Sequence, residues 1–200
     1  MRNPFFNPWK PPGFNGTLIL GESCPKGDET SGITGWRAHP DSEWPHNFII
    51  RHVEEKRLQD DSTFRALRSS FVYDGAVLES VAFWDAHAFS NLVPRLMGRR
   101  PSGKFERPGA RDKEPAREQF RLILEDVQPS RVLIASAWGT EVLKDLSDTH
   151  KYDAVQEGWQ MAFDQRPAIG IYHPQAWNQQ GYSIDQARRA TALLRTLPTR

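Results

Sequence analysis

Residues 131–137 read RVLIASA, a stretch of strand length that is apolar on both of its faces. Such a strand is typical of a sheet buried between two layers of helices. Two other runs share this character, and a further run of similar length contains an asparagine. They are TLILG at Thr17–Gly21, AIGIY at Ala168–Tyr172, and AFSNLV at Ala88–Val93. The sequence therefore predicts four short, widely spaced strands.

Segments with helical periodicity lie between these strands and after the last one. In Glu114–Val127, apolar residues recur at i, i+3, i+4 and i+7 from Phe120, and Pro129 favours an end just before it. The other predicted helices are Asp61–Phe71, Thr140–Leu146 and Ser183–Leu197. The alternation predicts one α/β domain over residues 1–200, a three-layer α/β/α arrangement around a mostly parallel four-stranded sheet. A long loop and helix insertion is expected at about 28–85.

The composition limits the classes of function. Of 200 residues, 38% are hydrophobic and 26% charged, which predicts a globular chain. No apolar run approaches the ~20 residues of a membrane helix, and Met1–Phe14 contains no apolar signal segment, so we expect a cytoplasmic protein. The single cysteine, Cys24, excludes an internal disulfide, a cysteine-based zinc site and a four-cysteine iron–sulfur cluster. We expect no metal and no cofactor.

The net charge of +1 does not by itself indicate a nucleic-acid binder. Basic residues nevertheless gather in the Pro/Gly-punctuated stretch Val93–Pro115. They are Arg95, Arg99, Arg100, Lys104, Arg107, Arg111 and Lys113. Two interpretations stay open, a loop along a phosphate backbone and a solvated surface loop.

Ligands of parallel α/β sheets bind beyond the carboxyl ends of the strands, so the residues there are the candidate site. Glu22 is the first carboxylate after the first strand, where it would orient or deprotonate a water, or else hold its loop through backbone N–H groups. The Gly-rich segment after it contains no phosphate-loop pattern. The third strand leads into Trp138 and Gly139.

Two more polar residues belong to predicted strand ends. Asn91, among apolar neighbours, offers a donor and an acceptor to the edge of a base, or ties down the following loop. His173 follows the last strand and would donate a hydrogen bond to developing negative charge. The remaining histidines are expected to be surface or structural residues, and none has metal-ligand spacing. They are His39, His46, His52, His87 and His150.

These pieces, in this order, resemble the uracil-DNA glycosylase superfamily over about Thr17–Trp177. The segment Gly21–Pro25 looks like its water-activating motif, Asn91 like its base-reading amide, and His173-Pro174-Gln175 like its last motif. The resemblance implies a uracil-DNA glycosylase-like fold, DNA as substrate, and catalytic roles for Glu22, Asn91 and His173.

The chain also departs from the superfamily pattern. The first motif is not Asp-Pro-Tyr-His, and the cysteines of the cluster-containing subfamilies are missing. The aromatic residue that stacks on the base would be Trp36, Trp44, Phe48 or the pair Phe83-Trp84, and the residue that wedges the duplex Gln175 or Trp177. The expected substrate and DNA contacts are Gly21, Ser23, Pro25, Trp36, Trp44, Phe48, Trp138, Pro174, Gln175, Trp177, Arg99, Arg100 and Lys104.

The resemblance implies a mechanism in which the nucleotide is flipped out, Asn91 holds the base, Glu22 positions the water, and His173 stabilises the leaving base. The departures fit an enlarged or differently lined pocket and are compatible with a bulky modified base, such as the glucosylated hydroxymethylcytosine of phage DNA, removed in anti-phage defence. Three alternatives stay open: a repair glycosylase for uracil or another deaminated base, a non-catalytic DNA-binding relative, and a small-molecule hydrolase or nucleotide-binding protein using the same crevice.

Overall fold

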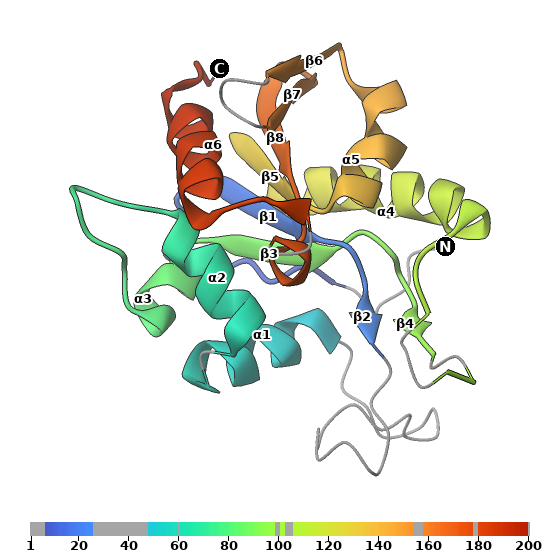
Figure 1. The fold of residues 1–200 in the computed structure, drawn as a ribbon, viewed down its shortest axis with the longest axis horizontal. Helices are drawn as coiled ribbons and strands as arrows, with labels where there is room; N and C mark the ends of the chain where they lie inside the picture. The colour runs from blue at the N-terminus through green and yellow to red at the C-terminus, as the bar shows by residue number, and fades with distance from the viewer. Residues whose placement is uncertain are drawn as a thin grey trace.

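The computed structural model describes residues 7–25, 48–59, 61–98, 101–102, 106–153, 158–177 and 180–199. Its centre is a six-stranded sheet in the order β3-β1-β5-β8-β7-β6 (Figure 1). The strands are β1 (Thr17–Gly21), β3 (Ala88–Asn91), β5 (Arg131–Ala135), β6 (Thr149–Asp153), β7 (Gly158–Phe163) and β8 (Arg166–Ile171). A separate parallel pair joins β2 (Cys24–Pro25) and β4 (Leu96–Met97).

The four predicted strands are β1, β3, β5 and β8, and each runs parallel to its neighbours among them. This confirms an α/β domain with a mostly parallel sheet. The expected number of four strands is wrong, because β7 and β6 extend the sheet beyond β8 as antiparallel strands. Asp164 and Gln165, both at positive φ, form the two-residue turn between β7 and β8. Consecutive left-handed residues match the right-handed twist of a hairpin.

The helices are α1 (Phe48–Gln59), α2 (Ser62–Ser70), α3 (Ser80–Trp84), α4 (Lys113–Val127), α5 (Ala137–Leu143) and α6 (Ile184–Thr196), with short 3₁₀ turns η2 (Ala110–Asp112), η3 (Lys144–Leu146) and η4 (Pro174–Ala176). The predicted helices correspond to α2, α4, α5 and α6. Side chains cap the N-termini of α2 and α6. Asp61 accepts from the Phe64 N–H at the start of α2, and Ser183 accepts from the Gln186 N–H at the start of α6. The helix predicted from Thr140 instead begins at Ala137, because Ser136 caps it.

Two apolar clusters cover the two faces of the sheet. Along β1, Ile19 packs into the cluster on the side of α1, α2, α3 and α6, whereas Leu18 and Leu20 pack into the cluster on the side of α4 and α5. This alternation follows from the two-residue period of a strand. Figure 1 shows the sheet between these helices. Within the described residues, no helix is both long and apolar enough to cross a membrane.

The outer edge of β3 is covered by the N-terminal segment. Trp9 and Phe89 exchange both backbone hydrogen bonds, at N···O distances of 2.8 and 3.0 Å. The Trp9 indole N–H also donates to the Trp84 carbonyl at 2.8 Å. The strand that ends at Asn91 is thus paired on both sides.

Candidate active site

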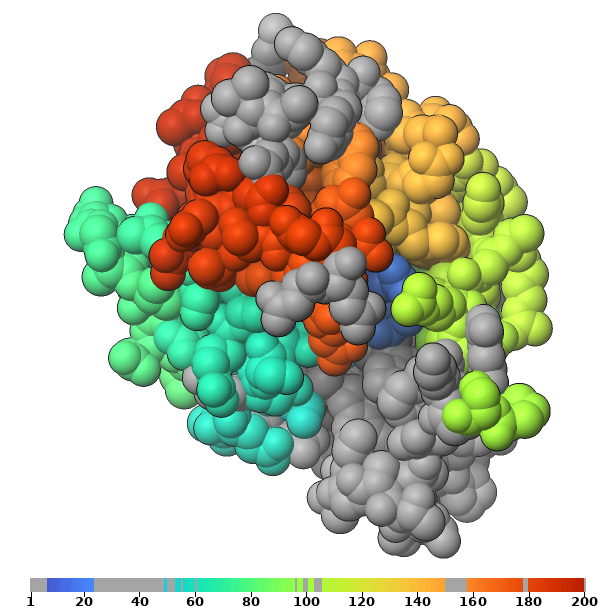
Figure 2. All heavy atoms as spheres, viewed as in Figure 1, coloured from blue at the N-terminus to red at the C-terminus, as the bar shows by residue number. Residues whose placement is uncertain are grey.

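The carboxyl ends of β3, β1, β5 and β8 lie next to one another at one edge of the sheet, because these four strands are adjacent and parallel. Each end contributes one polar side chain. Asn91 ends β3, Glu22 follows β1, Ser136 follows β5, and His173 is two residues beyond β8. In Figure 2 the blue segment that contains β1 reaches the surface between the orange-red segment after β8 and the yellow-green segment that leads into α4.

Asn91 lies directly against Gly21, its register partner in β1. A Cβ atom on Gly21 would overlap the Asn91 Oδ1 atom and come within 3.1 Å of the Phe89 ring. Glycine at position 21 is therefore what leaves room for the amide, which is only 4% exposed. The pairing continues past the strands, since Val93 N–H donates to the Glu22 carbonyl at 3.0 Å.

The Glu22 carboxylate accepts a hydrogen bond from the Ser136 hydroxyl, with 2.7 Å between Oγ and Oε2. Glu22 is partly exposed, and Ser136 is buried. The bond joins the ends of two neighbouring strands. Glu22 therefore has a defined place at the sheet edge.

His173 is partly buried and begins the η4 turn. Burial lowers the pKa of His173, and the nearby Glu22 charge opposes this by raising it. A lowered pKa favours the neutral ring near pH 7. The Nδ1 atom accepts from the Gln175 N–H at 3.3 Å, which assigns the proton of the neutral ring to Nε2. His173 thus offers one donor, the Nε2–H group.

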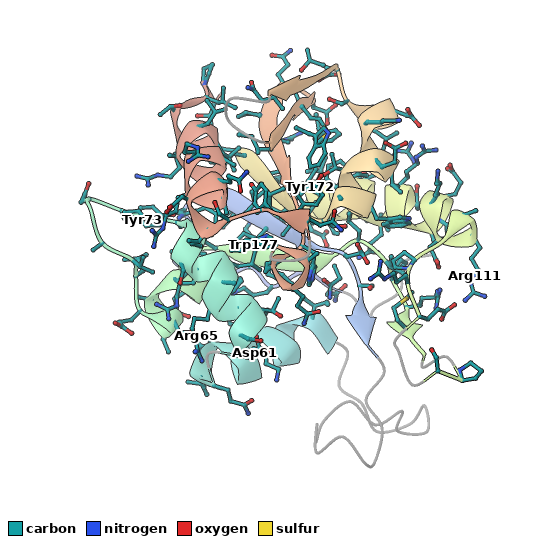
Figure 3. The ribbon with its side chains drawn as sticks, viewed as in Figure 1. Asp61, Arg65, Tyr73, Arg111, Tyr172 and Trp177 are labelled. Carbon is teal, nitrogen blue, oxygen red and sulfur yellow. The ribbon has the colours of Figure 1, made fainter. Side chains whose placement is uncertain are left out.

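The two candidates for a duplex wedge differ in exposure. Gln175 is exposed, and its side-chain amide donates to the Thr63 hydroxyl at 3.0 Å. Trp177 is 7% exposed, donates its indole N–H to the Tyr172 carbonyl at 2.8 Å, and packs against Tyr182. Figure 3 labels Trp177 and Tyr172 on the segment after β8. Of the two residues expected to wedge the duplex, this burial favours Gln175, because the Trp177 indole belongs to the core.

The structure also reduces the number of aromatic residues that could stack on a base. Phe83 and Trp84 are fully buried and pack against each other, so neither ring is exposed to a flipped-out base. Phe48 begins α1, but its side chain lies outside the described atoms, as does that of Pro25. Trp36, Trp44, Arg99, Arg100 and Lys104 lie outside the described residues. The other expected contacts are partly buried: Ser23 beside Glu22, Pro174 in η4, and Trp138, which packs against the cluster on the α4 side.

Acidic partners engage two residues of the basic stretch. Arg95 forms a bidentate pair with Asp112, with its Nε atom 2.7 Å from Oδ1, and also donates to Glu106 at 3.0 Å. Arg111 donates to the same Glu106. The hydrogen bonds from Arg95 lower the pKa of both Asp112 and Glu106. Arg95 therefore has a structural role. The interpretation of the basic stretch as a loop along a phosphate backbone did not predict this role.

A pocket of about 390 Å³ lies beside this cluster. Its walls are Val93, Pro94, Arg95, Arg111, Asp112 and Pro115. Val93, one of its wall residues, also donates its backbone N–H to the Glu22 carbonyl. Figure 3 labels Arg111 on this side of the molecule.

Sequence reasoning missed Ser136. The predicted strand Arg131–Ala137 ran through it, so it was not at a strand end. A serine at the N-cap of a helix accepts a hydrogen bond from the backbone N–H three residues later. Ser136 has this relation to Gly139, and this spacing is the sequence signal for its position at the start of a helix.

A comparison with known proteins finds no matching family model and no significantly similar curated sequence. Among the described residues, no group of three or more His, Cys, Asp or Glu side chains is arranged to hold a metal ion.

Proposed function

We propose that this chain is a monofunctional DNA glycosylase of the uracil-DNA glycosylase type, which hydrolyses the N-glycosidic bond of a flipped-out, non-canonical base and leaves an abasic site. The observation that carries the proposal is that Asn91, Glu22 and His173 lie at the carboxyl ends of β3, β1 and β8, which belong to one run of four adjacent parallel strands. An amide, a carboxylate and a neutral imidazole are the groups needed to hold a base, direct a water and stabilise a leaving anion.

The proposed reaction uses each group once. The bond between C1′ of the sugar and the base nitrogen breaks, and its electron pair leaves with the base. The Nε2–H of His173 donates to the developing negative charge on the base, which a neutral ring does without transferring its proton. Glu22 directs a water to C1′ and accepts a proton as the new C–O bond forms. Asn91 holds the base edge while this occurs.

The pocket beside Val93 supports a base with a substituent larger than the methyl group of thymine. Its volume is about 390 Å³, and its proline, arginine and aspartate walls suit a group with both apolar faces and hydroxyls. A hexose on hydroxymethylcytosine has that character. This favours removal of a bulky phage-type base, in anti-phage defence, over repair of uracil or another deaminated base.

The proposal is tested by incubating the purified protein with DNA that contains uracil, hypoxanthine or glucosyl-hydroxymethylcytosine, and scoring strand cleavage by alkali at abasic sites. Glu22→Gln and Asn91→Ala are expected to lose on the order of 10²–10³ in rate. Glu118→Gln, an exposed change on α4, is the control and should leave the rate unchanged.

Three outcomes would contradict the proposal. Unchanged base release by Glu22→Gln contradicts the assigned chemistry. Salt-dependent DNA binding without abasic product indicates a non-catalytic DNA-binding relative. Absence of any DNA binding favours a small-molecule hydrolase or nucleotide-binding protein.

A further inference from the structure

The Ser136 hydroxyl stands between Glu22 and the start of α5. Its Oγ atom accepts from the Gly139 N–H at 2.9 Å and donates to Glu22 Oε2 at 2.7 Å. Ser136 is fully buried, so no substrate atom reaches the hydroxyl directly. Its influence on chemistry must pass through Glu22.

The Ser136 hydroxyl accepts one hydrogen bond and donates another. A serine hydroxyl has one proton, and a backbone N–H can only donate. Oγ accepts from Gly139, and the hydroxyl proton is directed at Glu22 Oε2.

The turn that holds Ser136 is packed so that the hydroxyl has little freedom. The Thr140 backbone N–H and side-chain hydroxyl both donate to the Ser136 carbonyl, at 2.9 and 2.8 Å. A Cβ atom on Gly139 would lie 2.6 Å from the Leu92 side chain. Since Leu92 directly follows Asn91, the turn that orients Glu22 is fitted against the end of the strand that carries the base-reading amide.

We infer that Ser136 is a positioning residue, which holds one oxygen of Glu22 so that the other directs the attacking water. The inference rests on the proposed glycosylase function for its kinetic consequence. The geometry on which it depends, the hydroxyl shared by Glu22 and Gly139, is independent of that function.

The kinetic test compares two lost helix caps. Ser136→Ala removes the bond to Glu22 and the cap of α5, whereas Ser183→Ala removes the cap of α6 far along the chain from the site. We expect Ser136→Ala to lower kcat on the order of 10²-fold with KM within about 3-fold, since misplacement of a reacting group costs that much. Ser183→Ala should change neither constant, and Ser136→Thr, which keeps the hydroxyl, should restore most of kcat. Equal kcat for Ser136→Ala and wild type overturns the inference.

A second measurement needs no activity. The Glu22 charge raises the pKa of His173, so Glu22→Gln should lower the midpoint of the His173 imidazole titration followed by NMR. Ser136→Ala should shift this midpoint in the same direction, because the released carboxylate moves toward solvent, and Ser183→Ala should leave it unchanged. A midpoint that moves in Glu22→Gln but not in Ser136→Ala overturns the positioning role, and one that moves in neither overturns the Glu22–His173 proximity.

The two measurements separate the two proposals. If wild-type protein releases no base from any of the DNA substrates but the His173 midpoint follows Ser136, the glycosylase function fails and the positioning of Glu22 stands. If base is released but Ser136→Ala changes neither kcat nor the His173 midpoint, the function stands and the positioning role fails.

Discussion

His87 is fully buried at the amino-terminal end of β3, away from the candidate site, and its ring nitrogens have defined partners. Nδ1 lies 2.7 Å from the Phe83 carbonyl, which can only accept, so Nδ1 carries the proton. Nε2 lies 2.6 Å from the Tyr73 hydroxyl and 3.2 Å from the Asn15 amide nitrogen, both of which donate to it. The neutral ring is fully satisfied, and a second proton would meet a donor.

Burial lowers the pKa of His87 from 6.5 to about 4, helped by the Arg195 charge and opposed by the bond to Phe83. The unfolded chain therefore binds a proton between pH 6.5 and 4 that the folded chain does not bind. The stability from neutral His87 is fully present above pH 6.5 and is lost as the pH falls toward 4. At 1.36 kcal/mol per pKa unit, this group alone removes about 2 kcal/mol by pH 5 and about 3 kcal/mol in total.

The assay is urea unfolding at pH 7.5, 6.0 and 5.0 for wild type and His87→Phe, which keeps a ring in the site but cannot titrate. The variant should be less stable at pH 7.5, because Tyr73 and Asn15 lose their acceptor, and it should lose about 2 kcal/mol less than wild type between pH 7.5 and 5.0. His173→Gln serves as the control for the other histidine with a lowered pKa. Identical pH slopes in wild type and His87→Phe, or an NMR midpoint of His87 near 6.5, would refute the reasoning.

Three further changes test the packing around the site. Gly21→Ala places a methyl group on the Asn91 amide and should cost about 1–3 kcal/mol in urea unfolding, with loss of base release. Arg95→Ala leaves two carboxylates without their main partner and should lower the thermal midpoint clearly, whereas Arg121→Ala, which breaks an exposed pair on α4, should change stability by less than about 0.5 kcal/mol. Trp177→Ala should cost about 3–5 kcal/mol in urea unfolding, as for a core indole; a stable variant that only binds DNA less tightly would restore its assignment as a wedge.

The parallel part of the sheet could be predicted because its strands are buried on both faces, and such strands consist of continuous apolar residues. The antiparallel strands β6 and β7 contain no continuous apolar run of this kind. β6 reads THKYD, with polar residues throughout, and the turn before β8 uses Asp164 and Gln165 in place of the Asn-Gly pair that signals a hairpin. These features depend on the pairing of β7 with β8 and of β6 with β7, which a local pattern does not contain.

The candidate site was predictable where topology alone decides the position. Glu22, Asn91 and His173 each follow or end an apolar run, and parallel strands bring such ends together. Trp177 could not be assigned in this way, because its burial depends on the Tyr172 carbonyl and on Tyr182, which the η4 turn brings into contact with it. Partner geometry of this kind arises only in the folded chain.

The Trp9 segment also has a consequence for association between molecules. An outermost strand with unpaired N–H and C=O groups is a template on which another polypeptide can add a strand. Because Trp9 occupies these groups at Phe89, β3 is closed to such addition along that stretch. A chain shortened past Trp9 would expose an unpaired strand edge at Phe89, two residues from Asn91. The same deletion would then favour self-association at β3 and displace the Asn91 amide.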